Sequence, residues 1–394
     1  MKNNSHKRSI KYLFLCTVSI SMILPLLAGC TASAAEIASV DYIPLPGNDW
    51  EVSTPADQGL DPDLLARAYL NAQDLDTIYS LLVVKNGKLI AEKYFNDGAL
   101  ENKTLMQSAS KSYISALIGL ALEHGCLESV DQKMLDFFPE YVADITDPRK
   151  EAITIRHLLQ MRSGYPWEET HPDLMEAMWT GDNPPLVVGF PLTADPDTVF
   201  QYSNLSNAWL AAILSRACDT NLKDFSEEYF LEPMGVEMGE LWPNEYDDYH
   251  ALFHFRARDA AKFGLLYLNE GVLDGKQIFP AEWVRDSLKT YSEKVSTSGV
   301  DSGKIGRYFR EVGYGYQWWS ARAGEHYFNY AAGHGGQLIV LLEDLDMVIV
   351  TTAYPFFQQH DGGAWKHEKA IINLVGRFIE SLPIDQQETI DDHG

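Results

Sequence analysis

The sequence predicts an α/β (α+β) domain: an antiparallel sheet, built from both chain ends and flanked by helices, with a mostly helical subdomain inserted between its two parts. Two strand-like runs lie early in the chain, helical patterns fill its centre, and several strand-like runs follow one another near its end. The sheet part is expected at about 51–105 and 305–385, and the helical part at about 106–304.

The early elements are predicted by their turn and cap residues. Asp61-Pro62 is typical of a helix start, with Asp as N-cap and Pro in the first turn. Ile78 to Val84 and Leu89 to Tyr94 read as strands on either side of Asn86-Gly87, which favours a tight hairpin turn. The sheet should therefore begin with a β-hairpin.

The central pattern is helical. From Ser108 to about His124 the apolar residues cover more than one helix face, and Gly125 is the expected C-cap, so this helix should be buried. Residues 165–197 include one of the longest irregular stretches, and long ordered loops are often functional. Further helices are expected at 155–161, 208–217, 222–230 and 258–270.

The late pattern is that of strands and one closing helix. Strand periodicity places one of Trp318 and Trp319 in the core and the other, on the opposite side of the sheet, at a cleft or the surface. The expected elements are strands at 314–320, 327–331, 337–342 and 347–352, a turn at 343–346, an amphipathic helix at about 366–379 and a tail at 386–394.

Charge excludes one class of function. The chain has 394 residues and a formal net charge of -25, because 56 Asp and Glu outnumber 31 Lys and Arg. Nucleic acids are held by clustered basic residues, so nucleic-acid binding is not expected.

The N-terminus resembles a bacterial export signal. A basic start and an apolar run end in Leu27-Ala28-Gly29-Cys30, which resembles a lipobox, so we expect residues 1–29 to be removed, Cys30 to be lipidated and 30–50 to be a tether. Cleavage after Ala34 is the alternative and would give a secreted or periplasmic protein. In either case we expect an exported protein that contacts a membrane only through an N-terminal lipid.

Cysteine usage gives no sign of a metal. Only Cys126 and Cys218 remain in the body of the mature chain, and two buried free thiols are favoured over a disulfide. The chain has neither Cys-x-x-Cys nor His-Glu-x-x-His, so no metal and no cofactor are expected.

The first chemical feature is Ser108-Ala109-Ser110-Lys111 at the head of the buried helix. A Ser and a Lys three apart lie on one helix face, so the amine can reach the hydroxyl and take its proton. Ser110 has no Lys at that spacing and is expected to be structural. The alternative for Ser108 is a polar helix cap beside a solvated Lys.

Two further clusters of residues could take part in the same chemistry as Ser108 and Lys111. In Tyr202-Ser203-Asn204 the phenol can relay a proton, and the amide can orient a lysine or a substrate carbonyl. Gly333-His334-Gly335-Gly336-Gln337 leads into an apolar strand, where glycines allow a close approach of substrate or backbone; the alternative is an ordinary turn.

In this order and spacing, the three clusters resemble the serine β-lactamase-like superfamily of class C β-lactamases, D-Ala-D-Ala carboxypeptidases, esterases and 6-aminohexanoate-oligomer hydrolases. The stretches 153–164 and 258–264 add to the resemblance, which runs from about Ala56 to Phe378. It implies a β-lactamase/transpeptidase-like fold and an acyl-enzyme mechanism.

The resemblance also implies residue roles. Ser108 would be the acylated nucleophile, Lys111 its proton acceptor and Tyr202 the relay to the leaving group, with Asn204 beside the substrate or the lysine. His334, with Gly335 and Gly336, would take the place of the usual Lys-Thr/Ser-Gly, and the backbone N–H groups of Ser108 and Gln337 would form the oxyanion hole.

The third motif bears on the substrate. It lacks the amine and the hydroxyl that hold a β-lactam carboxylate, so it resembles the esterase and nylon-hydrolase branches more closely. We therefore expect a hydrolase of small esters or amides. A penicillin-recognising carboxypeptidase or β-lactamase, and a binding module without turnover, are the alternatives.

Overall fold

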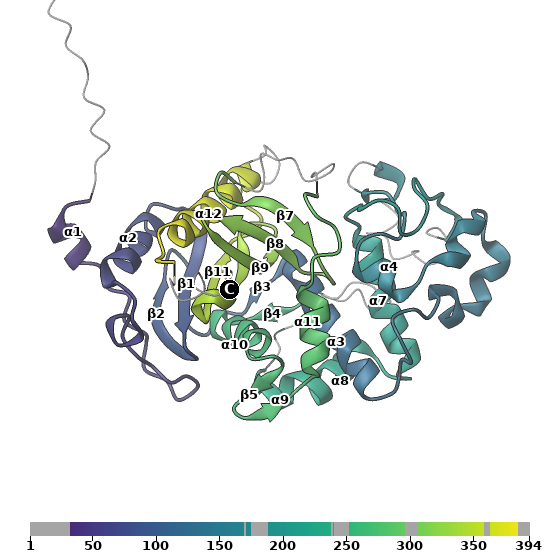
Figure 1. The fold of residues 1–394 in the computed structure, drawn as a ribbon, viewed down its shortest axis with the longest axis horizontal. Helices are drawn as coiled ribbons and strands as arrows, with labels where there is room; N and C mark the ends of the chain where they lie inside the picture. The colour runs from purple at the N-terminus through teal and green to yellow at the C-terminus, as the bar shows by residue number, and fades with distance from the viewer. Residues whose placement is uncertain are drawn as a thin grey trace, which may run out of the picture.

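The computed structural model describes residues 32–168, 171–174, 188–237, 239, 252–295, 306–357 and 363–384. Among them, seven strands form an antiparallel sheet with helices on both faces, and a helical region lies to one side of it (Figure 1). The predicted signal segment 1–29, Cys30 and the tail 386–394 lie outside the described residues.

The sheet joins the two ends of the chain, as predicted. Its strand order is β2-β1-β11-β10-β9-β8-β7, and the pairing of β1 with β11 connects the early hairpin to the late strands. The strands are β1 (Ile78–Lys85), β2 (Lys88–Tyr94), β7 (Arg310–Tyr314), β8 (Trp319–Ala323), β9 (His326–Gly333), β10 (Gln337–Leu342) and β11 (Met347–Ala353).

The predicted hairpin turn is confirmed. Asn86 and Gly87 have φ angles of 50° and 73°, the left-handed backbone that a two-residue turn between twisted strands needs. The predicted turn between β10 and β11 is also present, as a short 3-10 helix over Glu343–Leu345.

One predicted strand is wrong. Residues 314–320 were expected as a strand, but β7 ends at Tyr314 and β8 begins at Trp319. Gly315 lies so close to Ser287 that an added Cβ would be 2.3 Å from its carbonyl oxygen, and Gln317 has a φ of 61°. The apolar run therefore contains a tight turn, which its aromatic residues conceal in the sequence.

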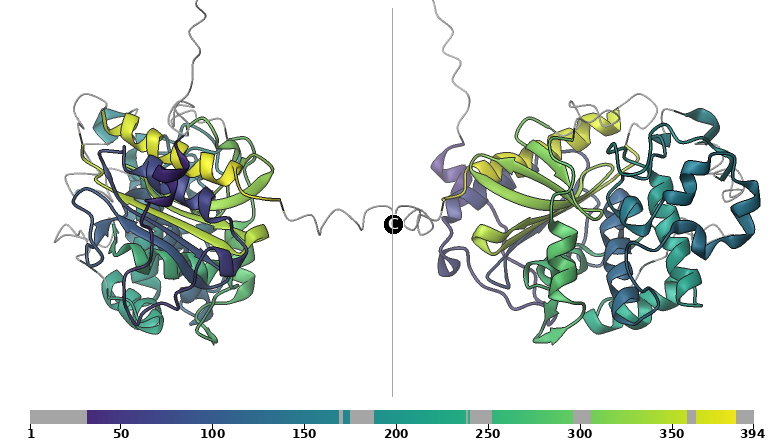
Figure 2. Two further views of the ribbon diagram at one scale, coloured as in Figure 1. Left: turned by 90° about the vertical axis from the view of Figure 1, so that its left-hand side faces the viewer. Right: turned by 45° about the vertical axis from the view of Figure 1, so that its right-hand side comes forward.

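Two hydrophobic cores lie on opposite faces of the sheet. The helices α2 (Pro62–Ala72) and α12 (Gly363–Glu380) cover one face, and α10 (Ala257–Leu268) covers the other (Figure 2). Trp318 packs in one core and Trp319 in the other, so the two lie on opposite sides as predicted, but both are buried and neither is at the surface.

The helical region is organised around two long helices, α3 (Ser110–Glu123) and α7 (Asn204–Ala217). A 3-10 turn, η2 (Gln107–Ala109), precedes α3. The other α-helices labelled in Figure 1 are α1 (Ala34–Ala38), α4 (Ile155–Leu159), α8 (Leu222–Ser226), α9 (Glu232–Met234) and α11 (Ala281–Leu288). The two small sheets pair β3 (Thr104–Leu105) with β4 (His254–Phe255) and β5 (Val272–Leu273) with β6 (Lys276–Gln277).

The expectation of two free thiols is wrong. Cys126 and Cys218 form a disulfide, with their Cα atoms 5.0 Å apart. Cys126 follows the C-terminus of α3 and Cys218 caps the C-terminus of α7. The sequence could not show this because the packing of α3 against α7, and not the spacing of the cysteines, brings them together.

Part of the segment expected as a tether packs against the domain. The Glu92 backbone N–H donates to the Tyr42 carbonyl at 2.8 Å. The buried Arg258 guanidinium donates to the Leu45 carbonyl at 2.7 Å and to Asp49 at 2.6 Å. Within the part of the chain that the structure describes, no helix is long and apolar enough to cross a membrane.

Candidate active site

Ser108 and Lys111 lie where the first motif placed them. Ser108 is in η2, and Lys111 follows in the first turn of α3 with only 5% of its surface exposed. Lys111 Nζ is 3.1 Å from Ser108 Oγ. Gln107, just before the serine, has a φ of 51°, an uncommon conformation for a residue other than glycine. The backbone therefore turns sharply as it presents the Ser108 hydroxyl.

The second motif, Tyr202-Ser203-Asn204, contacts the first through Lys111. Lys111 Nζ donates to Asn204 Oδ1 at 2.8 Å and lies 5.0 Å from the centroid of the Tyr202 ring. That ring stacks on Trp319 at 5.4 Å, which fixes its plane. The structure thus brings together Ser108, Lys111, Tyr202 and Asn204 from segments almost one hundred residues apart, with 93 positions between Lys111 and Asn204.

The third motif lies against the first through its backbone. Gly333, at the end of β9, is packed so closely that a Cβ there would be 2.1 Å from the Met106 carbonyl oxygen. Gly335 and Gly336 have φ angles of 89° and 105°, so the turn into β10 needs glycine at both positions. The turn therefore approaches the residues just before Ser108.

The side chains of the third motif face other partners. His334 Nδ1 is 2.8 Å from Glu368 Oε2, and the same oxygen accepts the Gly335 N–H at 2.9 Å. The Gln337 side chain is buried and bonds to both backbone groups of Ala353, at 2.8 and 2.9 Å, so it joins β10 to β11. The oxyanion role of the Gln337 N–H remains a prediction.

Sequence reasoning missed two carboxylates, Glu368 beside His334 and Glu168 beside Asn204. Glu168 is fully buried and accepts a hydrogen bond from the Asn204 N–H at 3.0 Å. Burial raises the pKa of its carboxyl. No local pattern marks either residue, because each meets its partner only through tertiary packing. A buried acid beside a helix start is a signal that only the structure supplies.

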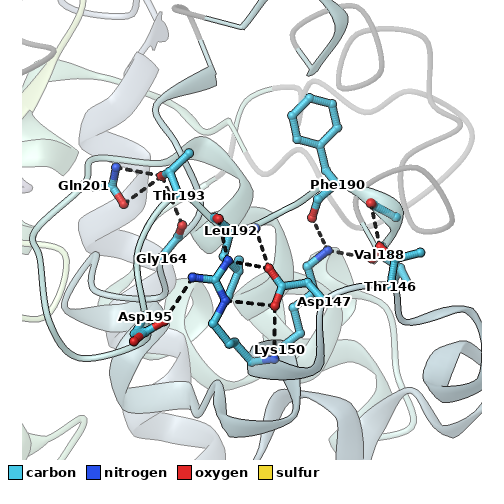
Figure 3. A network of polar contacts seen from close by, with 12 residues as sticks. Thr146, Asp147, Lys150, Gly164, Val188, Phe190, Leu192, Thr193, Asp195 and Gln201 are labelled. Atoms are coloured by element: carbon cyan, nitrogen blue, oxygen red, sulfur yellow. Dashed lines mark hydrogen bonds and ion pairs between the residues drawn. The ribbon is translucent and has the colours of Figure 1, made fainter.

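The long segment 165–197 is fastened in its C-terminal part, at residues 188–195 (Figure 3). The Lys150 ammonium donates to the carbonyls of Val188, at 2.6 Å, and Phe190. Arg149 donates to the Leu192 carbonyl at 2.7 Å and pairs with Asp147 at 2.6 Å. These contacts come from residues 147–150 and tie the segment to the helical region.

Two ionisable groups of this fastening have perturbed pKa values. Burial lowers the pKa of Lys150 to about 8, although the Asp147 carboxylate opposes the shift. The hydrogen-bonded Arg149 guanidinium holds the pKa of the Asp147 carboxyl well below its usual range. The carboxylate of Asp147 is therefore ionised at all ordinary pH values.

The fold and the serine–lysine pair define the class of protein: a serine hydrolase with a β-lactamase/transpeptidase-like fold. The chain belongs to the beta-lactamase family, which it matches over residues 79–364.

Individual relatives are distant. The chain is 23% identical to the 6-aminohexanoate-dimer hydrolase of Paenarthrobacter ureafaciens over 278 residues, which are 66% of this chain and 67% of that protein. It is 32% identical over 133 residues to a "Probable fimbrial assembly protein FimD, serogroup H1" of Dichelobacter nodosus, and that match spans only 33% of either chain.

A solved structure confirms the fold. EstCE1, described as a hydrolase with promiscuous acyltransferase activity, superposes with a TM-score of 0.61 at 14% identity. The superposition covers 81% of this chain and all (100%) of EstCE1. At this level of identity the likeness shows the fold alone.

Proposed function

We propose that this protein hydrolyses small esters or amides through an acyl-enzyme on Ser108. The observation that carries the proposal is the position of Lys111 Nζ, buried and within hydrogen-bonding distance of both Ser108 Oγ and Asn204 Oδ1. A serine is a weak nucleophile until a neighbouring base takes its proton, and this amine is placed to do so.

The chemistry follows in two halves. Ser108 Oγ bonds to the acyl carbon as its proton passes to Lys111 Nζ, and the leaving alcohol or amine departs with a proton relayed by Tyr202. Water then attacks the acyl-enzyme, releases the acid and restores the Ser108 hydroxyl. The backbone N–H groups of Ser108 and of Gln337, the first residue of β10, would stabilise the oxyanion in both halves.

The third motif supports esters and neutral amides over β-lactams. A β-lactam carries a carboxylate that needs a cation, and here the only basic side chain of the motif, His334, is already paired with Glu368 at 2.8 Å. A second carboxylate would be repelled by Glu368. The similarity to a 6-aminohexanoate-dimer hydrolase also supports small amides as substrates.

Export is part of the proposal. The apolar N-terminal run and Cys30 favour a lipid-anchored envelope protein, with simple secretion as the alternative. The disulfide between Cys126 and Cys218 supports an oxidising compartment, because thiols are kept reduced in the cytosol.

The first prediction concerns the nucleophile. We expect a fluorophosphonate to add covalently to the wild-type protein and not to Ser108→Ala, with no adduct from a penicillin. Ser108→Ala should lose hydrolysis of short acyl esters by at least about 10³-fold while remaining folded, since removing a nucleophile leaves only residual catalysis. Intact-mass spectrometry and ester turnover measure both.

The outcomes separate the alternatives. A penicillin adduct at Ser108 would favour the penicillin-recognising reading. A wild-type protein that reacts with neither probe would favour a binding module on the same scaffold. Full activity in Ser108→Ala would exclude Ser108 as the nucleophile.

A further inference from the structure

Glu168 has an unusual environment for an acid. Its side chain is completely buried, and its carboxylate receives three hydrogen bonds. Ser203 Oγ and the Leu205 N–H donate to Oε1 at 2.5 and 3.0 Å, and the Asn204 N–H donates to Oε2 at 3.0 Å. All three donors belong to the start of one helix, α7.

A helix start needs acceptors because its first backbone N–H groups have no partner within the helix. In α7, the N-cap Ser203 supplies only one, accepting from the Ser206 N–H at 3.2 Å. Glu168 satisfies the N–H groups of Asn204 and Leu205 from a segment 36 and 37 positions away. The start of α7 is thus fixed relative to the residues that follow Gly164.

That segment is itself held firmly. Ser163 Oγ is 2.9 Å from Ser206 Oγ in the first turn of α7. At Gly164 the φ of 89° and the 2.3 Å that would separate a Cβ from the Ala194 carbonyl oxygen leave room for no side chain. Glu168 therefore connects α7 to a firmly positioned segment.

The start of α7 carries two groups of the candidate active site. Asn204 Oδ1 accepts from Lys111 Nζ at 2.8 Å, and the Tyr202 ring lies 5.0 Å from the same nitrogen. Moving the backbone at 203–205 would move Asn204, and with it the adjoining Tyr202, away from Lys111. A displacement of about 1 Å at a reacting group can cost about a hundredfold in rate.

We propose that Glu168 is a positioning residue of this enzyme: its buried carboxylate holds the start of α7 so that Tyr202 and Asn204 stay in place beside Lys111. The proposal rests on the acyl-enzyme function above. It assigns Glu168 no contact with the substrate.

Both oxygens of the Glu168 carboxyl group are needed as acceptors, because together they receive three hydrogen bonds. A glutamine has one acceptor oxygen and would turn an NH₂ group toward at least one of the three donors, leaving that donor unpaired in a buried site. Glu168→Gln therefore tests the hydrogen bonds with almost no change in volume. Glu168→Asp keeps the charge but shortens the reach, and it should retain part of the function.

Glu92→Gln is the matched control. Glu92 is a buried carboxylate on the edge strand β2, bonded to Arg258 and to the Leu45 N–H, and it lies outside the candidate active site. The Glu92→Gln variant should have lower thermal stability, because a buried ion pair is lost, and its kcat should stay within about threefold of wild type.

The experiment compares kcat and KM for a short-chain nitrophenyl ester, thermal unfolding and amide hydrogen exchange in the full mature chain. For Glu168→Gln we expect kcat to fall about 10- to 100-fold, with KM within about threefold of wild type. The substitution displaces the groups that take part in the reaction and removes no contact with bound substrate. The amides of Asn204 and Leu205 should exchange faster than in wild type. Glu168→Asp should recover part of kcat.

Several results would overturn the proposal. One is a folded Glu168→Gln protein with wild-type kcat and wild-type exchange at Asn204 and Leu205. Another is a loss of kcat that Glu92→Gln reproduces at equal loss of stability. If Glu168→Gln does not fold, Glu168→Asp decides by the same readouts. Failure of the proposed function is separate, because it would appear as absence of turnover and of any Ser108 adduct in the wild-type protein.

Discussion

Glu368 places a carboxylate against the third motif, beside His334. Its carboxylate accepts from the Gly335 N–H at 2.9 Å and pairs with His334 at 2.8 Å, and it comes from α12, a helix with no sequence motif of its own. The histidine is thereby given a fixed orientation, and the motif presents a paired side chain where a free cation would attract anionic substrates.

A charge substitution at this position tests that interpretation. Glu368→Gln should lower the KM for an ester with a carboxylate in its acyl group about three- to tenfold relative to a neutral ester of similar size, because one repulsive charge is removed. Steady-state kinetics on a succinyl and an acetyl ester at two salt concentrations measure the ratio.

Glu380→Gln provides the control on the same helix. Glu380 is 41% exposed and paired with Arg310, away from the third motif. It should leave the ratio unchanged. An unchanged ratio in Glu368→Gln as well would show that Glu368 does not determine discrimination against anions.

Lys150 makes stability depend on pH. Its pKa is lowered by burial to about 8 in the folded protein, from an ordinary value of 10.5. Between these values the unfolded chain binds more protons than the folded one, so this group makes the free energy of unfolding rise with pH from about 8 to 10.5. Below about 8 its buried charge costs stability throughout.

The corresponding experiment is urea unfolding of wild type and Lys150→Met from about pH 7 to 10. The stability of wild type relative to the variant should increase as the pH rises above 8, where Lys150 loses its proton. A difference that is constant across this interval would contradict the shifted pKa. Lys289→Met, an unburied lysine, serves as the control.

At the scale of elements, the disulfide and the active site lie at opposite ends of the same two helices. α3 and α7 each have 14 residues, with Lys111 and Asn204 bonded near their N-termini and Cys126 and Cys218 joined after their C-termini. At 1.5 Å per residue the two ends are separated by about 20 Å. The disulfide therefore fixes the pair of helices from the end remote from the serine.

Removing the Cys126–Cys218 disulfide should mainly lower the stability of the fold. Cys126→Ser with Cys218→Ser should lower the free energy of unfolding by about 2–4 kcal/mol, because the bond closes a loop of 92 residues. Urea unfolding of the double variant, and of wild type with and without reductant, measures the effect. Equal stability of all three would mean that the bond contributes nothing in solution.

Elements with strong local signals could be predicted from the sequence. The Asn86-Gly87 hairpin, the Asp61 cap and β10 over Gln337–Leu342 were all found in place, because turn chemistry and alternation determine them locally. The prediction of a strand at 314–320 was wrong because Gly315 packs against the Ser287 backbone, a tertiary contact that no local pattern in the sequence shows. α11 was not predicted, although its packing face includes Trp283 and Val284.

At the scale of the whole molecule, the motifs predicted which residues meet, and the packing determined what supports them. Ser108, Lys111, Tyr202 and Asn204 were all expected in one site and lie together. Glu168, Glu368 and the Cys126–Cys218 bond were not expected, since each joins segments whose approach is set only by the folded core. The catalytic candidates could thus be predicted, and their supporting contacts could not.

The parallel arrangement of α3 and α7 has an electrostatic consequence. Each helix carries a macrodipole equivalent to about half a positive charge at its N-terminus, and both N-termini lie at the serine. Side by side, these like ends repel one another, and the acceptor oxygens of Glu168 at the start of α7 offset part of that repulsion by receiving its backbone N–H groups. In a chain with a net charge of -25, the field at long range repels anions. The local field of the two helix N-termini at Ser108, the proposed nucleophile, instead favours a negative charge.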